Sequence, residues 1–138
     1  MRFMMLYKPG TESDAPPSQQ EMVALGQLIE EMAKAGVLIA TDGLQQSLKG
    51  ARVRISEGKF TVTDGPFTET KELIAGYAII QAKSKQEAIE LTKRFLQVMG
   101  EGESEIRLMQ DAADCGAEAA LDLGEAGEPQ LAQVAAKR

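Results

Sequence analysis

Asp64-Gly65-Pro66-Phe67 closes a short β-branched segment, residues 61–63, and makes the chain turn sharply. Gly65 can adopt backbone dihedral angles that are closed to other residues, and Pro66 fixes its own φ angle. Asp64 therefore stands at the end of a predicted strand. Its carboxylate either accepts hydrogen bonds from the N–H groups of the turn or points into a cleft and takes part in chemistry there.

The segment before this turn predicts a β-hairpin. Residues 51–55 and 59–63 alternate in polarity on both sides of the short connection Ser56-Glu57-Gly58. Alternation around a short connection that contains glycine is typical of two antiparallel strands. The predicted hairpin has Val53 and Ile55 on one face and Arg52 and Arg54 on the other.

Further periodic segments lie on either side of the hairpin and predict four strands and two helices. The strands are Arg2–Lys8, Val37–Thr41, Leu73–Gln81 and Glu105–Met109, with apolar residues on both faces of the first and third. The helices open at two Ser-x-x-Glu capping boxes, Ser18 with Glu21 and Ser84 with Glu87, and they end at Gly36 and Gly100. Each helix carries one apolar stripe at three- and four-residue steps.

This order predicts an α+β fold, a ferredoxin-like β-α-β-β-α-β sandwich with an inserted β-hairpin. Both helices would cover the same face of an antiparallel sheet, and the other face would have no helix. Strands that are apolar on both sides favour docking of that face on a second copy, so we expect a homodimer. We also expect the strand Val37–Thr41 to neighbour the first strand and to bring Asp42 near Lys8.

Composition excludes several kinds of partner. The net charge of −6 argues against a nucleic-acid partner, whose binders need clustered Lys and Arg. No apolar run is long enough to span a membrane and the N-terminal residues lack a secretory signal, so we expect a cytoplasmic protein with no membrane partner. The chain has no His and one cysteine, Cys115, so we expect no cofactor and no metal bound through imidazole or paired thiolates. A carboxylate-only site for Mg²⁺ or Ca²⁺ stays open, although the sequence has no Asp-x-Asp-x-Asp-Gly run.

The last part of the chain differs in composition from the rest. We expect one folded domain over residues 1–109 and a separate acidic, Ala-rich arm or tail over residues 110–138. The first part of this tail has good helix formers, whereas Gly124, Gly127 and Pro129 interrupt the helical pattern in its second part. A helix packed on a dimer and a solvated tail without function are both open for this segment.

The residues around the turn resemble the YCII-related family, in the branch named after its DGPF motif. The resemblance rests on the run from Thr63 to Glu72, on Gly50-Ala51-Arg52-Val53-Arg54 before it, and on Gly76-Tyr77 and Ser84-Lys85-Gln86-Glu87-Ala88 after it. It extends from Met1 to about Met109. It implies membership of the dimeric α/β-barrel group, whose members form homodimers.

The resemblance also implies catalysis by a pair of side chains, one of which this chain does not have. Some YCII-related proteins are thought to pair a His with an Asp in a cleft, and relatives often carry the His just after the Gly-Leu that corresponds to Gly43-Leu44. This chain has Gln45 there, which can hydrogen-bond a ligand but cannot shuttle a proton. Relatives are also fused to, or encoded beside, extracytoplasmic-function sigma factors, which implies a sensing or partner role.

Two functions remain open for a chain whose ligand the sequence does not identify. The first is a small-molecule-binding or accessory dimer, with a ligand cleft at the Asp64 turn. The second is a small lyase-, isomerase- or hydrolase-type enzyme that uses Asp64 as its catalytic acid or base. In either case the predicted site consists of Asp64, Gln45, Arg54, Phe67 and Tyr77, because convergent polar groups over apolar walls are what a small-molecule site needs.

Overall fold

A computed structural model describes residues 1–13, 15–67, 72–111 and 113–114 of the chain. The chain divides into two units, Met1–Leu108 and Met109–Arg138, and the helices and strands of the described residues all lie in the first. Most of the acidic tail predicted for residues 110–138 lies outside the described residues. No helix in the described ranges is long and apolar enough to cross a membrane.

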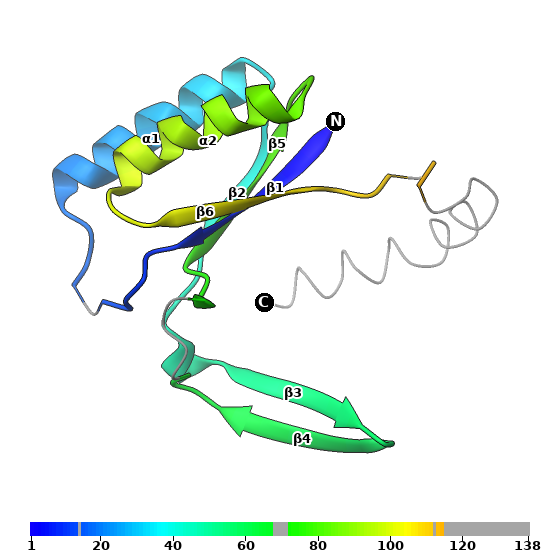
Figure 1. The fold of residues 1–138 in the computed structure, drawn as a ribbon. Helices are drawn as coiled ribbons and strands as arrows, with labels where there is room; N and C mark the ends of the chain where they lie inside the picture. The colour runs from blue at the N-terminus through cyan, green and yellow to red at the C-terminus, as the bar shows by residue number, and fades with distance from the viewer. Residues whose placement is uncertain (14, 68–71, 112, 115–138) are drawn as a thin grey trace. The chain divides into compact units, whose positions relative to one another are not determined.

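A four-stranded antiparallel sheet forms the centre of the first unit (Figure 1). Its strands are β1 (Arg2–Lys8), β2 (Leu38–Gly43), β5 (Gly76–Gln81) and β6 (Glu103–Leu108), in the order β2-β5-β1-β6. The order confirms the predicted α+β class and is consistent with a ferredoxin-like arrangement. The prediction that the first and third of these strands are central is also confirmed, because β1 and β5 each have a neighbour on both sides.

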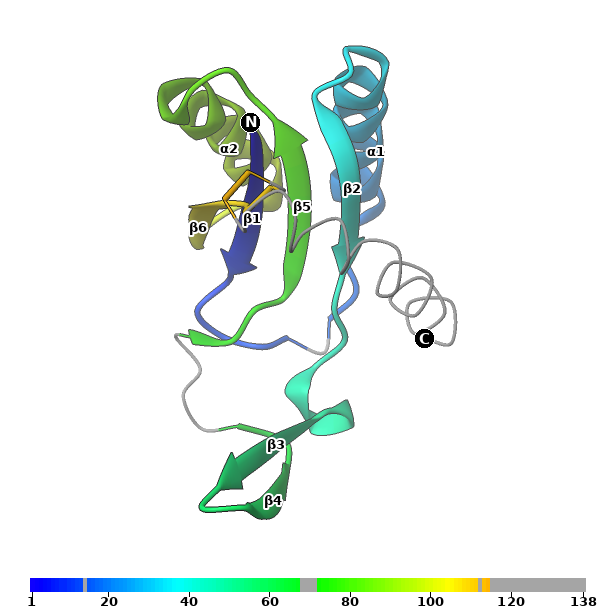
Figure 2. The same cartoon turned by 90° about the vertical axis from the view of Figure 1, so that its right-hand side faces the viewer.

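Two helices, α1 (Gln19–Lys34) and α2 (Lys85–Met99), lie on one side of this sheet (Figures 1 and 2). Helix α1 begins with the predicted capping box, in which the side chains of Ser18 and Glu21 each accept a backbone N–H of the other residue. Helix α2 begins in a related way, since Ser84 Oγ accepts the Glu87 N–H at 3.1 Å. These caps satisfy N–H groups that have no partner inside the helices.

The core lies between the helices and the covered face of the sheet. Phe3 and Met5 of β1 and Ile80 of β5 point toward this face, and Met32 of α1 packs against them. Ile80 is 0% exposed and Met32 is 1% exposed. The partners in the sheet confirm a shared face, because Phe3 pairs directly with Ile80.

Two sequence-based expectations about the sheet are wrong. Strand β2 pairs with β5 and not with β1, so Asp42 is opposite Tyr77 and not beside Lys8. The reason is that a third strand lies between the two parallel strands of a split β-α-β unit. The strand predicted from Leu73 begins instead at Gly76, because the Ala75 N–H and C=O bond to Tyr7 and Leu44, outside the ladder of β5.

The predicted hairpin is present as β3 (Ala51–Ser56) and β4 (Lys59–Asp64), which form a separate two-stranded sheet (Figure 1). The turn consists of two residues, Glu57 with φ 52° and Gly58 with φ 79°. Positive φ at both central residues is typical of the turns that match the twist of antiparallel strands. Every residue of both strands is exposed, so neither face of the hairpin packs on another described element.

Candidate functional site

The Asp-Gly-Pro-Phe motif packs against a short 3-10 helix, η1 (Ser47–Lys49). The Gly65 N–H donates to the Gly50 carbonyl at 3.0 Å, and the Phe67 N–H donates to Ser47 Oγ at 3.1 Å. The Gly65-Pro66 peptide bond is cis. A Cβ atom on Gly65 would overlap with the carbonyl oxygen of Ser47, so the motif needs glycine here for the close approach of the two backbones, and not for a positive φ angle.

Ser47 also connects the motif to the loop that follows β1. Its N–H and its Oγ both donate to the carboxylate of Glu12, at 2.7 and 2.9 Å. A carboxylate that accepts two hydrogen bonds from one residue fixes the position of that residue well. These hydrogen bonds therefore connect three segments that are far apart in sequence, through Glu12, Ser47 and Phe67. Their role is to hold the motif in position.

The structure does not bring the predicted site residues into one cleft. Asp64 is exposed, and none of the described residues donates a hydrogen bond to its carboxylate. Gln45 Oε1 accepts from Lys49 Nζ at 2.6 Å, and Arg54 lies opposite Thr61 on the polar face of the hairpin. The Phe67 ring lies 4.1 Å from the guanidinium carbon of Arg52, a cation–π contact within the motif region.

A cavity of about 270 Å³ lies between the sheet and the helices, at the end of the sheet where β1 ends and β5 begins. Its walls are mainly apolar. The larger apolar side chains come from both helices and from β1, and Ala78 adds a small one from β5: Met5, Leu25, Ile29, Phe95, Leu96 and Met99, with Ala78. Tyr77 also contributes to the lining, although the alternation of β5 directs its ring to the opposite sheet face from buried Ala78.

Four polar residues border this cavity: Tyr7, Thr41, Asp42 and Ser104. The Tyr7 hydroxyl donates to the Glu101 carbonyl at 3.0 Å, and burial raises the pKa of Tyr7 above its ordinary value. Thr41 Oγ1 donates to the Tyr77 carbonyl at 2.9 Å. Both hydroxyls therefore donate their proton to a backbone carbonyl, and their oxygen lone pairs are left to accept hydrogen bonds from a group in the cavity. Asp42 is exposed and adds a carboxylate at the border.

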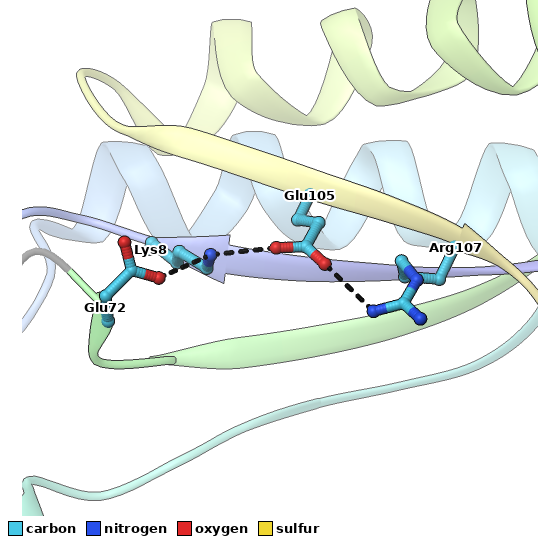
Figure 3. A network of polar contacts seen from close by, with 4 residues as sticks. All are labelled: Lys8, Glu72, Glu105 and Arg107. Atoms are coloured by element: carbon cyan, nitrogen blue, oxygen red, sulfur yellow. Dashed lines mark hydrogen bonds and ion pairs between the residues drawn. The ribbon is translucent and has the colours of Figure 1, made fainter.

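A second polar cluster lies on the sheet face that the helices leave uncovered (Figure 3). Lys8 Nζ is 3.0 Å from Glu72 Oε2 and 2.9 Å from Glu105 Oε1, and Arg107 Nη1 is 3.3 Å from Glu105 Oε2. The hydrogen bonds to Glu105 and Glu72 raise the pKa of Lys8, and those from Lys8 and Arg107 lower the pKa of Glu105. The Lys8 side chain is 9% exposed, so these carboxylates satisfy a cation that is largely removed from water.

Sequence reasoning missed the cavity and the roles of Ser47 and Glu12. Each depends on contacts between segments that no local pattern connects. The Lys8 cluster had one signal, since Lys8 is the last residue of an otherwise apolar strand. Among the described residues, no group of three or more acidic or Cys side chains is close enough together to hold a metal ion.

The fold and these sites define the chain as an α+β protein with an apolar helix–sheet cavity and no metal cluster among its described residues. Comparison with known families matches residues 1–106 to the YCII-related domain, and the chain therefore belongs to this family. It is also 32% identical, over 75 residues, to an uncharacterized protein of Rhizobium meliloti (strain 1021). That match covers 54% of this chain and 60% of the relative.

Proposed function

We propose that this YCII-related chain is a homodimeric small-molecule-binding protein whose ligand occupies the helix–sheet cavity. The observation that supports it most is the cavity itself, about 270 Å³ with mainly apolar walls and a few polar groups at its border. Ligand sites in proteins are mostly apolar concavities of about 300–1,000 Å³ with a small number of placed polar groups. The cavity lies just below this range, which favours a small ligand.

The polar border suggests which ligand chemistry fits. Tyr7 and Thr41 present oxygen acceptors because their hydroxyl protons are donated to backbone carbonyls. Asp42 adds a carboxylate, so the border favours a hydrogen-bond donor or a cation on the ligand. We therefore propose a small, mainly apolar ligand that carries an amine or hydroxyl group directed at Asp42.

The homodimer part of the proposal rests on the uncovered sheet face. By strand alternation, Met4 and Leu6 of β1 and Tyr77 and Ile79 of β5 share this face. Apolar side chains on a face without a helix are typical of a surface that packs on another protein layer. Face-to-face packing of two such sheets would form a dimeric α/β barrel. The DGPF branch and a cytoplasmic location remain part of this proposal.

An enzyme that uses Asp64 is the second candidate. Asp64 is exposed and receives no hydrogen bond from the described residues, so its carboxylate is available to a ligand. Arg54 and Phe67 would then contribute charge and an apolar surface nearby, and Gln45 a hydrogen bond. An accessory role beside an extracytoplasmic-function sigma factor rests on the family resemblance alone.

A thermal-shift screen against a metabolite panel tests the cavity with two variants. Ala78 lines the cavity and is buried, so Ala78→Leu is designed to fill it. Compounds that raise the melting temperature of the wild type should raise that of Asp64→Asn equally and should not act on Ala78→Leu. Circular dichroism of Ala78→Leu checks that the fold is intact.

The opposite pattern would favour the second candidate. Hits that act on Ala78→Leu but not on Asp64→Asn would place the ligand at the motif turn and refute the cavity site. Turnover of such a hit by the wild type, lost in Asp64→Asn with the fold intact, would establish the enzyme. Sedimentation velocity at micromolar concentration tests the dimer, and a monomer there contradicts it.

A further inference from the structure

The hairpin presents a contiguous apolar strip to solvent. Val53 pairs directly with Val62, and Ile55 pairs directly with Phe60, so the four side chains lie on one face. Each is between 62% and 73% exposed. Single exposed apolar residues are ordinary on protein surfaces, whereas four adjacent ones on one ribbon mark an interaction surface.

A two-stranded ribbon of this kind is only marginally stable by itself. Isolated hairpins need a third strand or a packed layer to be stable in water. Hydrogen bonds hold the base of the hairpin, where Gly65 bonds to Gly50, but its strands have no buried residue. The apolar strip therefore needs a partner surface that is available to every molecule of the protein. A second copy of the chain meets this condition, because it is always present at the same concentration.

The charge of the hairpin fits a second copy as that cover. Its residues 51–64 carry three basic side chains, Arg52, Arg54 and Lys59, against two acidic side chains, Glu57 and Asp64, so the hairpin has a small positive charge. The whole chain has a net charge of −6, so the rest of the chain is more acidic still. A basic arm is attracted to an acidic body, and complementary charge of this kind favours association and sets its orientation.

We propose that the β3–β4 hairpin is an arm that packs its Val53, Ile55, Phe60 and Val62 strip on a second copy of this chain. This proposal specifies a contact within the homodimer proposed above and rests on that dimer. A two-fold axis repeats the contact, so each protomer gives one arm and receives one. If each strip side chain buries on the order of 100 Å², two arms and their receiving surfaces reach about 1,600 Å², the size of a standard stable interface.

Sedimentation velocity of three full-length proteins tests the arm. Phe60→Asp places a charge on the apolar strip, and Thr61→Asp places the same charge on the opposite face of the same strand. We expect the wild type and Thr61→Asp to be dimers at micromolar concentration, with self-association of Phe60→Asp weakened about 100-fold. Both positions are exposed, so both variants should keep the wild-type circular dichroism spectrum and fold.

Hydrogen exchange separates a second copy from other covers of the strip. Protection of the β3 and β4 amides should rise with protein concentration in the wild type and not in Phe60→Asp. Protection that is equal in the wild type and Phe60→Asp, and that stays unchanged when the wild type is diluted until it dissociates, would mean that the chain covers its own hairpin, and it would refute the arm. A Phe60→Asp protein that remains as dimeric as Thr61→Asp would refute the arm while the dimer itself stands. A monomeric wild type would refute both, whatever the cavity screen shows.

Discussion

The four-stranded sheet and the β3–β4 hairpin are built from similar alternating segments but have opposite environments. In the sheet, Ile80 of β5 is 0% exposed beneath the helices, whereas Ile55 of β3 is 62% exposed. Both are isoleucines on the apolar face of an antiparallel strand. Their alternation specifies which face a side chain takes, and the layer above that face decides whether the side chain contributes to stability.

The two regions also differ in what fixes their geometry. The sheet is held by a core to which strands and both helices contribute. The hairpin is positioned at its base by backbone hydrogen bonds from the motif, including the Phe67 N–H to Ser47 Oγ. Removing buried volume should therefore damage the sheet, and removing a permissive glycine should damage the hairpin or its base.

The largest expected difference is between Ile80→Ala and Ile55→Ala. Ile80→Ala leaves a cavity in a fully packed site and should lower the free energy of unfolding by about 2–5 kcal/mol. Ile55→Ala should change it by less than about 0.5 kcal/mol, as exposed substitutions usually do. Urea denaturation at protein concentrations low enough to avoid self-association measures both, and equal losses would contradict the contrast between the two regions.

The next effect is expected at the motif. Gly65→Ala places a Cβ against the backbone of Ser47, which cannot rotate away, and should cost about 1–3 kcal/mol of unfolding free energy. Gly26 in α1 is the matched control, because no atom lies within 4 Å of an added Cβ there. Gly26→Ala should stabilise the protein by roughly 0.5–1 kcal/mol. Thermal melts compare the two, and a neutral Gly65→Ala would contradict the close approach.

A smaller effect is expected at the hairpin turn. Gly58 has a φ of 79°, which disfavours a side chain, so Gly58→Ala should raise the free energy of the local hairpin by about 1 kcal/mol. Because the hairpin contributes nothing to the core, the midpoint of global unfolding should change little. Hydrogen exchange should show faster exchange in β3 and β4 with unchanged exchange in β5. An equal increase in both sheets would show that they unfold together.

The smallest effect is expected from the Lys8 cluster and depends on pH. The pKa of Glu105 is lowered by Lys8 and Arg107, so its contribution to stability is present above the ordinary carboxyl pKa and is lost as the pH falls through the lowered value. The pKa of Lys8 is raised, so its contribution is lost only as the pH rises through that raised value. Melting temperatures of the wild type and Glu105→Gln between pH 2 and pH 7 check this, and the two curves should converge at the acid end.

Local patterns predicted much of this fold, because helix caps and strand alternation depend on neighbouring residues. Ser18 with Glu21 predicted the start of α1, and alternation around Glu57-Gly58 predicted the hairpin. The pairing of β2 was predicted wrongly, because pairing is set by the whole sheet and not by β2 itself. The expected site at the Asp64 turn remains a proposal, whereas the cavity was not predicted, because its walls come from six separate elements and the loop before β5.

The pairing of the end of β2 with the start of β5 brings together the two ends of the segment that contains the hairpin. Gly43 pairs directly with Gly76, and the Leu44 N–H donates to the Ala75 carbonyl at 2.8 Å, so the chain leaves and re-enters the sheet at the same point. Everything between these residues is an excursion whose ends already touch, and the entropy of closing such a loop changes only slowly with its length. The Gly43–Gly76 pair is therefore an insertion point. A segment of another length or sequence can replace the hairpin there, while the four strands and two helices keep the hydrogen bonds among themselves.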